Sequence, residues 1–183
     1  MRDFLLCGAA LAALLVAGCD RQKAAESQAN APATVAGTTA GVDRSQAGKP
    51  APAITFKDGD GQETTLAAFA GKPLLLNLWA TWCAPCVKEL PTLDALADKP
   101  GAPQVLALSQ DTAPAAEVQA FLAERKIGLE AYQDAEMAMS GELGVNIMPT
   151  TVLYGSNGKE IWRYTGDLDW TGDKAAALLK EAR

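Results

Sequence analysis

The sequence has no histidine at any of its 183 positions. This absence excludes Ser-His-Asp and Cys-His catalysis and histidine-ligated zinc or haem. It also removes the side chain that most often carries protons near neutral pH. Chemistry in this chain must therefore use Cys, Asp, Glu, Lys or Tyr.

Clustered positive charge is missing as well. The formal net charge is -6, and the sequence contains no polybasic run. Because phosphate binding needs grouped Lys and Arg, we expect no nucleic-acid partner. The length, with 49% hydrophobic and 21% charged residues, suits one domain with a core plus some unstructured sequence.

The apolar run near the N-terminus is short for a membrane span. Phe4 to Ala17 has 14 residues, whereas a membrane helix needs about 20. The run ends in small residues, so residues 1–18 are predicted to be a signal peptide. The ending Leu15 to Cys19 resembles a bacterial lipobox, which implies cleavage before Cys19 and lipidation of that residue. An ordinary signal peptide and an uncleaved anchor are the alternatives.

The residues after Cys19 predict a tether. Asp20 resembles the signal that retains lipoproteins at the inner membrane, which implies a position on its periplasmic face. Residues 19–50 contain scarcely any large apolar side chain, so we expect a lipidated N-terminus followed by a flexible linker. Cleavage removes Cys7 and lipidation blocks Cys19, which leaves Cys83 and Cys86 as free thiols.

Residues 51–183 are predicted to form the folded domain. Two hairpins are expected, with strands at 54–56 and 64–66 and at 150–154 and 161–164. Buried strands are expected at 74–79 and 105–108. A brief helix should end near Gly71, and longer helices are expected at 85–98, interrupted by Pro91, and at 114–126, 136–143 and 173–182. Ala176, Leu178 and Leu179 should face inward from the last helix. This order predicts an α/β fold with a central mixed sheet flanked by helices.

Cys83 and Cys86 lie two residues apart at the predicted start of a helix. The helix N-terminus offers free backbone amides and a positive dipole end, so Cys83 is expected to be the more acidic and reactive thiol. Cys86 lies one turn further on and can attack a mixed disulfide formed on Cys83. Pro85 suits the first helical turn. A structural disulfide or half of a zinc site is the alternative, although no second Cys pair or His completes tetrahedral zinc.

Several motifs around this pair resemble a known family. Trp82 to Cys86, Pro91 and the stretch Met148 to Thr150 resemble thioredoxin-fold oxidoreductases. Residues 76–91 resemble more narrowly the TlpA/ResA-like and cytochrome c maturation branch of membrane-tethered thioredoxins. The resemblance spans 51–183. It implies a thioredoxin fold with an N-terminal hairpin and a central insertion within 110–146.

The resemblance also assigns a proton-handling acid. General thioredoxins have a buried acid where this chain has Asn77, and an amide cannot serve as an acid. The TlpA/ResA-like branch uses a Glu three residues after the second cysteine, which is Glu89 here. Residues 86 and 89 share a helix face. Glu89 is therefore predicted to raise the pKa of the Cys86 thiol and to accept its proton through water. An ordinary solvated Glu is the alternative.

The resemblance implies a substrate-binding surface. Pro149 is expected to be a cis proline facing the cysteines, with the Met148 backbone exposed for strand-like pairing with a substrate; a plain turn proline is the alternative. Trp82 is expected to cover Cys83, with Ala84 and Pro85 beside it. Trp79, Trp162 and Phe121 are expected in the core, and Trp170 has no assigned place. The acids of the insertion are expected on a solvated face, or one of them beside the substrate groove: Glu117, Glu124, Glu130, Asp134 and Glu136.

The predicted function is reduction of disulfides in exported proteins. Cys83 attacks, Cys86 resolves and Glu89 handles the proton, with no cofactor. The resemblance implies a transmembrane electron donor of the CcdA/DsbD kind, and apocytochrome c or copper-site assembly factors as clients. One alternative is a Cu(I)-binding chaperone that uses Cys83, Cys86 and Met148, extended by Met137 and Met139. A disulfide oxidase or isomerase is the other. A thiol peroxidase is excluded, because it needs a Thr three residues before the reactive Cys, and this chain has Ala80 at that position.

Overall fold

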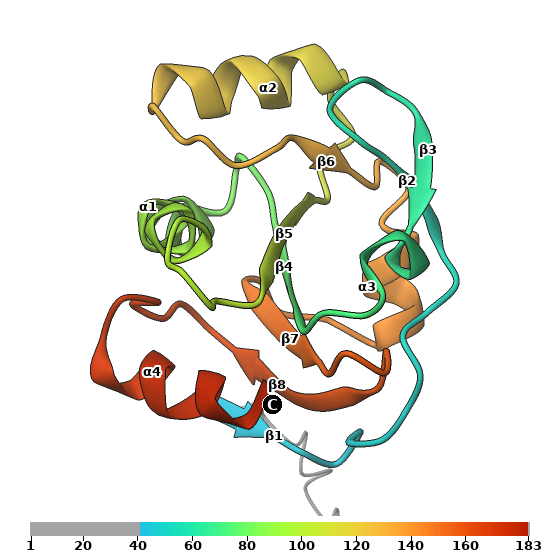
Figure 1. The fold of residues 1–183 in the computed structure, drawn as a ribbon. Helices are drawn as coiled ribbons and strands as arrows, with labels where there is room; N and C mark the ends of the chain where they lie inside the picture. The colour runs from blue at the N-terminus through green and yellow to red at the C-terminus, as the bar shows by residue number, and fades with distance from the viewer. Residues whose placement is uncertain (1–40, 183) are drawn as a thin grey trace, which may run out of the picture. The chain divides into compact units, whose positions relative to one another are not determined.

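The computed structural model describes residues 41–182. The predicted signal peptide and the lipidation site Cys19 lie outside this range. Within it, no helix has the length and apolar character needed to cross a membrane. The predicted mixed sheet flanked by helices is confirmed (Figure 1).

The strands form one eight-stranded sheet in the order β1-β8-β7-β4-β5-β6-β2-β3. They are β1 (Gly41–Asp43), β2 (Thr55–Lys57), β3 (Glu63–Thr65), β4 (Leu74–Trp79), β5 (Gln104–Ser109), β6 (Tyr132–Gln133), β7 (Thr150–Tyr154) and β8 (Glu160–Thr165). β4 pairs in parallel with β5 and antiparallel with β7. Every residue of β4 is buried, as its continuous apolar run predicts for a strand covered on both faces.

Four α-helices and two 3-10 helices lie among the described residues: α1 (Ala84–Ala97), α2 (Ala115–Glu124), α3 (Ala138–Leu143), α4 (Asp173–Leu179), η1 (Leu66–Phe69) and η2 (Lys180–Ala182). α1, α2 and α4 pack on one face of the sheet, around the cluster that contains both cysteines. α3 and η1 cover the other face. Because successive side chains of a strand alternate between faces, Leu75, Asn77 and Trp79 of β4 all face α1.

Three features of the fold differ from the sequence prediction. The sheet begins at Gly41, inside the segment that we expected to be linker, because β1 pairs with the edge of β8. β6 was not predicted, since a strand of two residues carries no periodicity. The prediction that Pro91 interrupts the first long helix is wrong. α1 continues through Pro91, which lies on the exposed face while Leu90 and Leu93 are buried against the sheet.

The inward face of the last helix also differs from the prediction. Ala175 and Leu178 are buried, whereas Ala176 is exposed and Leu179 is half-buried. The helix is shorter than expected, and η2 takes over from Lys180. The tighter winding of a 3-10 helix then brings Ala182 inward.

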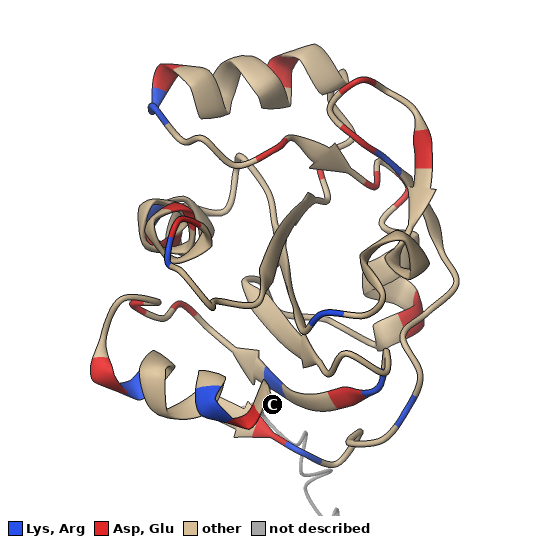
Figure 2. Ribbon diagram, in the orientation of Figure 1, with Lys and Arg blue, Asp and Glu red and all other residues tan. Residues whose placement is uncertain are grey.

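Charged residues of both signs are interspersed over the described chain (Figure 2). Lys88 and Asp167 form a surface ion pair of 2.9 Å. Arg163 and Glu160 form a more enclosed pair of 2.8 Å, and their side chains are 14% and 2% exposed. Neither pair contains a residue that the sequence analysis assigned to the site.

Candidate functional site

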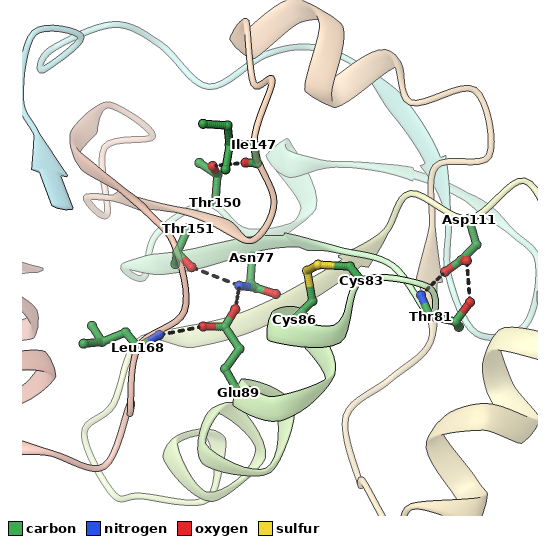
Figure 3. The surroundings of a disulfide bond; sticks show 10 residues. All are labelled: Asn77, Thr81, Cys83, Cys86, Glu89, Asp111, Ile147, Thr150, Thr151 and Leu168. Atoms are coloured by element: carbon green, nitrogen blue, oxygen red, sulfur yellow. Dashed lines mark hydrogen bonds between the residues drawn. A yellow bond between two sulfur atoms is a disulfide. The ribbon is translucent and has the colours of Figure 1, made fainter. Parts of the chain in front are cut away.

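Cys83 and Cys86 are joined by a disulfide bond at the N-terminus of α1 (Figure 3). Cys83 is the N-cap residue, and its carbonyl accepts a hydrogen bond of 3.0 Å from the Val87 amide. Cys83 is 7% exposed and Cys86 is fully buried. Cys83 is thus the cysteine nearer the surface, and Cys86 is the more deeply buried of the two.

The surface around Cys83 is formed by its neighbours in sequence. Ala84 and Pro85 are exposed, and Trp82 is 67% exposed. Pro85 stands at the start of the helix, where its missing amide hydrogen has no helical partner. Exposed apolar side chains beside a shielded disulfide are suited to contact another polypeptide.

Glu89 lies one helical turn beyond Cys86 and is buried, with 2% of its surface exposed. Its Oε1 accepts a hydrogen bond of 2.7 Å from Asn77 Nδ2. Its Oε2 accepts one of 3.1 Å from the Leu168 amide and one of 3.2 Å from Trp170 Nε1. The alternative of an ordinary solvated helix Glu is therefore wrong.

The protonation of Glu89 reflects two opposing effects. Burial disfavours the charged carboxylate and raises its pKa from the ordinary range, whereas the three N–H donors favour the charge and lower the pKa. Burial is the larger effect, so the pKa of Glu89 is raised to about 7. A carboxyl that titrates near neutral pH can both accept and return a proton under physiological conditions.

Asn77 occupies the centre of β4 and is fully buried. Its Nδ2 donates to Glu89 and also, over 2.9 Å, to Oγ1 of Thr151 on β7. The residue therefore connects the middle of the sheet to the buried acid (Figure 3). Sequence reasoning identified the position but not this contact, because Thr151 is distant along the chain.

The Met148–Pro149 peptide bond is cis, as predicted. Pro149 immediately precedes β7, and the pairing of Thr150 with Leu78 puts it at the end of β4 that leads to the cysteines. Met148 is half-buried and packs against the cluster that contains Cys83 and Cys86. Its neighbour Ile147 is 42% exposed. The sequence analysis did not single out Ile147.

Trp170 and Asp111 are two further buried residues to which the sequence analysis assigned no role. Trp170 is 1% exposed and donates to Glu89. Asp111 follows β5 and is buried, and its carboxylate accepts hydrogen bonds from the Thr81 amide (2.9 Å) and the Thr81 hydroxyl (2.6 Å). Asp111 thereby attaches the segment before Cys83 to the neighbouring strand.

The other predicted residues lie as follows. Trp79 and Trp162 are in the core as expected, while Phe121 is half-buried. Glu117, Glu124, Glu130 and Glu136 are exposed, as predicted for a solvated face. Asp134 is not: it is buried, and it accepts hydrogen bonds from two backbone amides at the start of α3. Its role is to hold that helix.

Met137 and Met139, the two methionines proposed to extend a metal site, differ in burial. Met139 is fully buried in the cluster on the sheet face opposite the cysteines, so it cannot join them as a ligand. Met137 is 42% exposed. Within residues 41–182, no group of three or more Cys, Asp or Glu side chains is arranged to hold a metal ion.

Comparison with known proteins agrees with this geometry. Residues 46–179 match the family model for Redoxin. Thiol-disulfide oxidoreductase ResA of Bacillus anthracis is 31% identical over 127 residues, which cover 68% of this chain and 73% of that protein. Thiol:disulfide interchange protein DsbE of Pseudomonas fluorescens biotype C is 35% identical over 147 residues, covering 74% and 79%.

The solved structures agree as well. A DsbE-type protein from Chlorobium tepidum superimposes with a TM-score of 0.66 and 25% sequence identity, covering 75% of this chain and 98% of that one. The fold is thus thioredoxin-like, and the protein is a thiol-disulfide oxidoreductase. The chain belongs to the Redoxin family and is of the ResA/DsbE type.

Proposed function

We propose that this enzyme reduces disulfides in exported proteins through Cys83 and Cys86, with Glu89 as the proton acceptor. The observation that carries the proposal is the buried carboxyl of Glu89, one helical turn behind Cys86, with a pKa of about 7. A structural disulfide needs no titratable group behind its inner sulfur.

The reaction has two steps that balance. The Cys83 thiolate attacks a client disulfide, forms a mixed disulfide and releases one client sulfur as a thiolate that takes up a proton. Cys86 gives its proton to Glu89 through water, and its thiolate attacks Cys83 Sγ. The second client sulfur leaves as a thiolate and takes the proton back from Glu89. The client leaves with two thiols, and the Cys83–Cys86 disulfide observed here is the oxidised product. Two electrons pass from the enzyme to the client.

The proposed client-binding residues surround this disulfide. Trp82, Ala84 and Pro85 are exposed beside Cys83, and Met148 packs against the cysteine cluster. An extended client segment would lie between the first turn of α1 and the segment that leads to Pro149. Its backbone would pair with that of Met148, since main-chain pairing recognises a peptide without regard to its sequence.

The remaining parts of the proposal concern place and partners. A lipid on Cys19 would hold the domain at the periplasmic face of the inner membrane, with the residues after it as tether. Each turnover leaves the enzyme oxidised, so a membrane donor of the CcdA/DsbD kind would restore the thiols. Apocytochrome c and copper-site assembly factors are the proposed clients, because both carry cysteine pairs that must be reduced before they bind haem or copper.

The reduction potential of the Cys83–Cys86 couple tests the direction of transfer. A value near that of thioredoxin, about -270 mV, is expected for a reductant, whereas a value near that of DsbA, about -120 mV, would show an oxidase. The Cys86→Ala variant should trap clients on Cys83 as mixed disulfides. Recovery of none, together with tight Cu(I) binding by the wild type, would favour the chaperone. Cys19→Ser should move the protein from the membrane to the soluble fraction.

A further inference from the structure

The side-chain oxygen of Asn77 has no partner in the oxidised protein. Asn77 Oδ1 is buried, and within residues 41–182 no donor lies within hydrogen-bonding distance of it. A buried amide oxygen without a donor destabilises the protein, because the hydrogen bonds that it made to water are not replaced. Because this atom lies beside a redox centre, the reduced state of that centre could supply the missing donor.

The orientation of the amide is fixed by its other end. Asn77 Nδ2 donates to Glu89 Oε1 and to Thr151 Oγ1, so both amide hydrogens are used. Rotating the amide by half a turn would place Oδ1 against the Glu89 carboxylate and would lose the bond of 2.7 Å. Oδ1 is therefore held on the side of the amide away from Glu89.

That side faces the disulfide. Asn77 points from β4 toward α1, the helix that carries both Cys86 and Glu89, because its amide nitrogen bonds to Glu89. Its Nδ2 meets Glu89, and Cys86 is the buried residue of the preceding turn on the same helix face. In Figure 3 the Asn77 oxygen points toward the Cys86 end of the disulfide, and the nitrogen points toward Glu89. In this state Cys86 has no hydrogen to offer, because its sulfur is bonded to Cys83.

We propose that Asn77 Oδ1 is the hydrogen-bond acceptor for the Cys86 thiol in the reduced enzyme. Reduction by a dithiol breaks the Sγ–Sγ bond and delivers two electrons and two protons, while the dithiol becomes a disulfide. One proton goes to Cys86 Sγ, and this S–H donates to Asn77 Oδ1. The other goes to Cys83 Sγ, from which it is lost to solvent when that thiol ionises. The contact exists only in the reduced state, so it stabilises the dithiol relative to the disulfide. It also keeps the Cys86 proton close to Glu89, which is bonded to the nitrogen of the same amide.

This inference rests on the proposed redox role of the cysteine pair. It adds a second function to Asn77. The amide nitrogen holds Glu89, the proton acceptor, and the amide oxygen holds the thiol of Cys86, the proton donor. Asn77 would thus align Cys86 and Glu89 for the transfer. An Asp at this position could not donate to Glu89 when ionised, and two carboxylates would face each other.

The test compares wild type with Asn77→Leu, which has a side chain of similar size and no polar atom. Equilibration with dithiothreitol should show the variant shifted about threefold to tenfold toward the disulfide, because a weak S–H bond is lost. A tenfold shift corresponds to a potential about 30 mV lower. In the reduced-minus-oxidised infrared spectrum, the wild type should show an S–H stretch displaced to low wavenumber, and the variant should lose that displacement.

Two controls separate this contact from a general disturbance. Thr151→Val removes the other partner of Asn77 Nδ2 but keeps Oδ1, and it should retain the displaced S–H band. Trp170→Phe weakens the support of Glu89 without touching Asn77, and it should retain the band too. An unchanged equilibrium and an unchanged band in Asn77→Leu would overturn the proposal.

The wild type alone gives an independent check if Asn77→Leu does not fold. An S–H stretch of reduced wild type at the position of a free thiol rejects the contact. A DsbA-like potential in the wild type would instead contradict the proposed direction of electron transfer and leave the Asn77 contact intact. The two hypotheses therefore fail on different measurements.

Discussion

Trp170 donates its indole N–H to Glu89 Oε2 over 3.2 Å, although the two residues are 81 positions apart in the chain. Both side chains are buried. The Leu168 amide donates to the same oxygen over 3.1 Å, and the Trp170 amide donates to Thr92 Oγ1, one turn further along α1, over 3.1 Å. The loop between β8 and α4 is thus attached to α1 at the proposed proton acceptor.

Replacing Glu89 by Gln should slow disulfide exchange without unfolding the domain. Gln cannot take the Cys86 proton, so the resolving step should lose the contribution of a general base, about 10²-fold. The rise in rate between pH 6 and 8, which follows ionisation of a group with a pKa of about 7, should disappear. Stopped-flow reduction of a disulfide peptide measures both effects. Glu117→Gln, an exposed acid on α2, should behave as wild type; an unchanged pH profile in Glu89→Gln would exclude the role.

Removing the indole N–H should raise the pKa of Glu89 further. Trp170→Phe keeps most of the buried ring but deletes one of three donors to the carboxylate, and such donors lower the pKa. A hydrogen bond to a charged group is worth about 1.5–3 kcal/mol, so we expect a rise of about one to two pKa units. Titration of the Glu89 carboxyl by carbon-13 NMR measures it.

Trp162→Phe is the matched control for this prediction. Trp162 is equally buried, but its Nε1 donates to the Leu178 carbonyl and not to Glu89. Both variants should lose stability, and only Trp170→Phe should move the titration of Glu89. Equal titration curves in the two variants would contradict the assignment.

The stability of the oxidised protein should fall as the pH rises through the titration of Glu89. The folded state holds this proton up to a pKa of about 7, and the unfolded chain loses it near 4.5. Between these values the folded state binds more protons, so its stability decreases with increasing pH. The total effect is about 3 kcal/mol. Urea unfolding from pH 5 to 8 should show the free energy of unfolding of Glu89→Gln rising relative to wild type by that order. A constant difference would mean that Glu89 ionises normally.

The contact between Asp111 and Thr81 should support the segment before Cys83. Asp111→Ala leaves the Thr81 amide and hydroxyl and the Ser109 hydroxyl without their acceptor, which should cost about 2–3 kcal/mol of unfolding free energy. Thr81→Ala should cost about 1 kcal/mol.

A double-mutant cycle tests whether these two residues act together. The double variant should be less destabilised than the sum of the single changes, by about 1 kcal/mol. Thr112→Ala, at an exposed neighbour of Asp111, should leave stability unchanged. Additive losses in the cycle would mean that Asp111 does not act through Thr81.

Much of this protein can be predicted from its sequence, because the decisive signals are local. The apolar run of β4, the turn of the second hairpin and the paired cysteines before a helix each depend on neighbouring residues. The spacing of Glu89 from Cys86 is likewise local, since one helical turn places both on one face. Residues 1–40, with the predicted signal peptide and lipidation site, remain a prediction from sequence alone.

What only the tertiary structure decided is how distant segments meet. The carboxyl of Glu89 on α1 is enclosed by Asn77 of β4 and by Leu168 and Trp170 of the loop between β8 and α4, which are distant from it in the chain. No periodicity in the sequence shows that Trp170 faces an acid or that Gly41–Asp43 adds a strand to the sheet. Nor does it show that Asp134 is buried while the glutamates of the predicted insertion are exposed. Side-chain burial and the pairing of edge strands depend on how the sheet and helices pack. The pKa that makes Glu89 a proton acceptor depends on the same packing, because burial raises it.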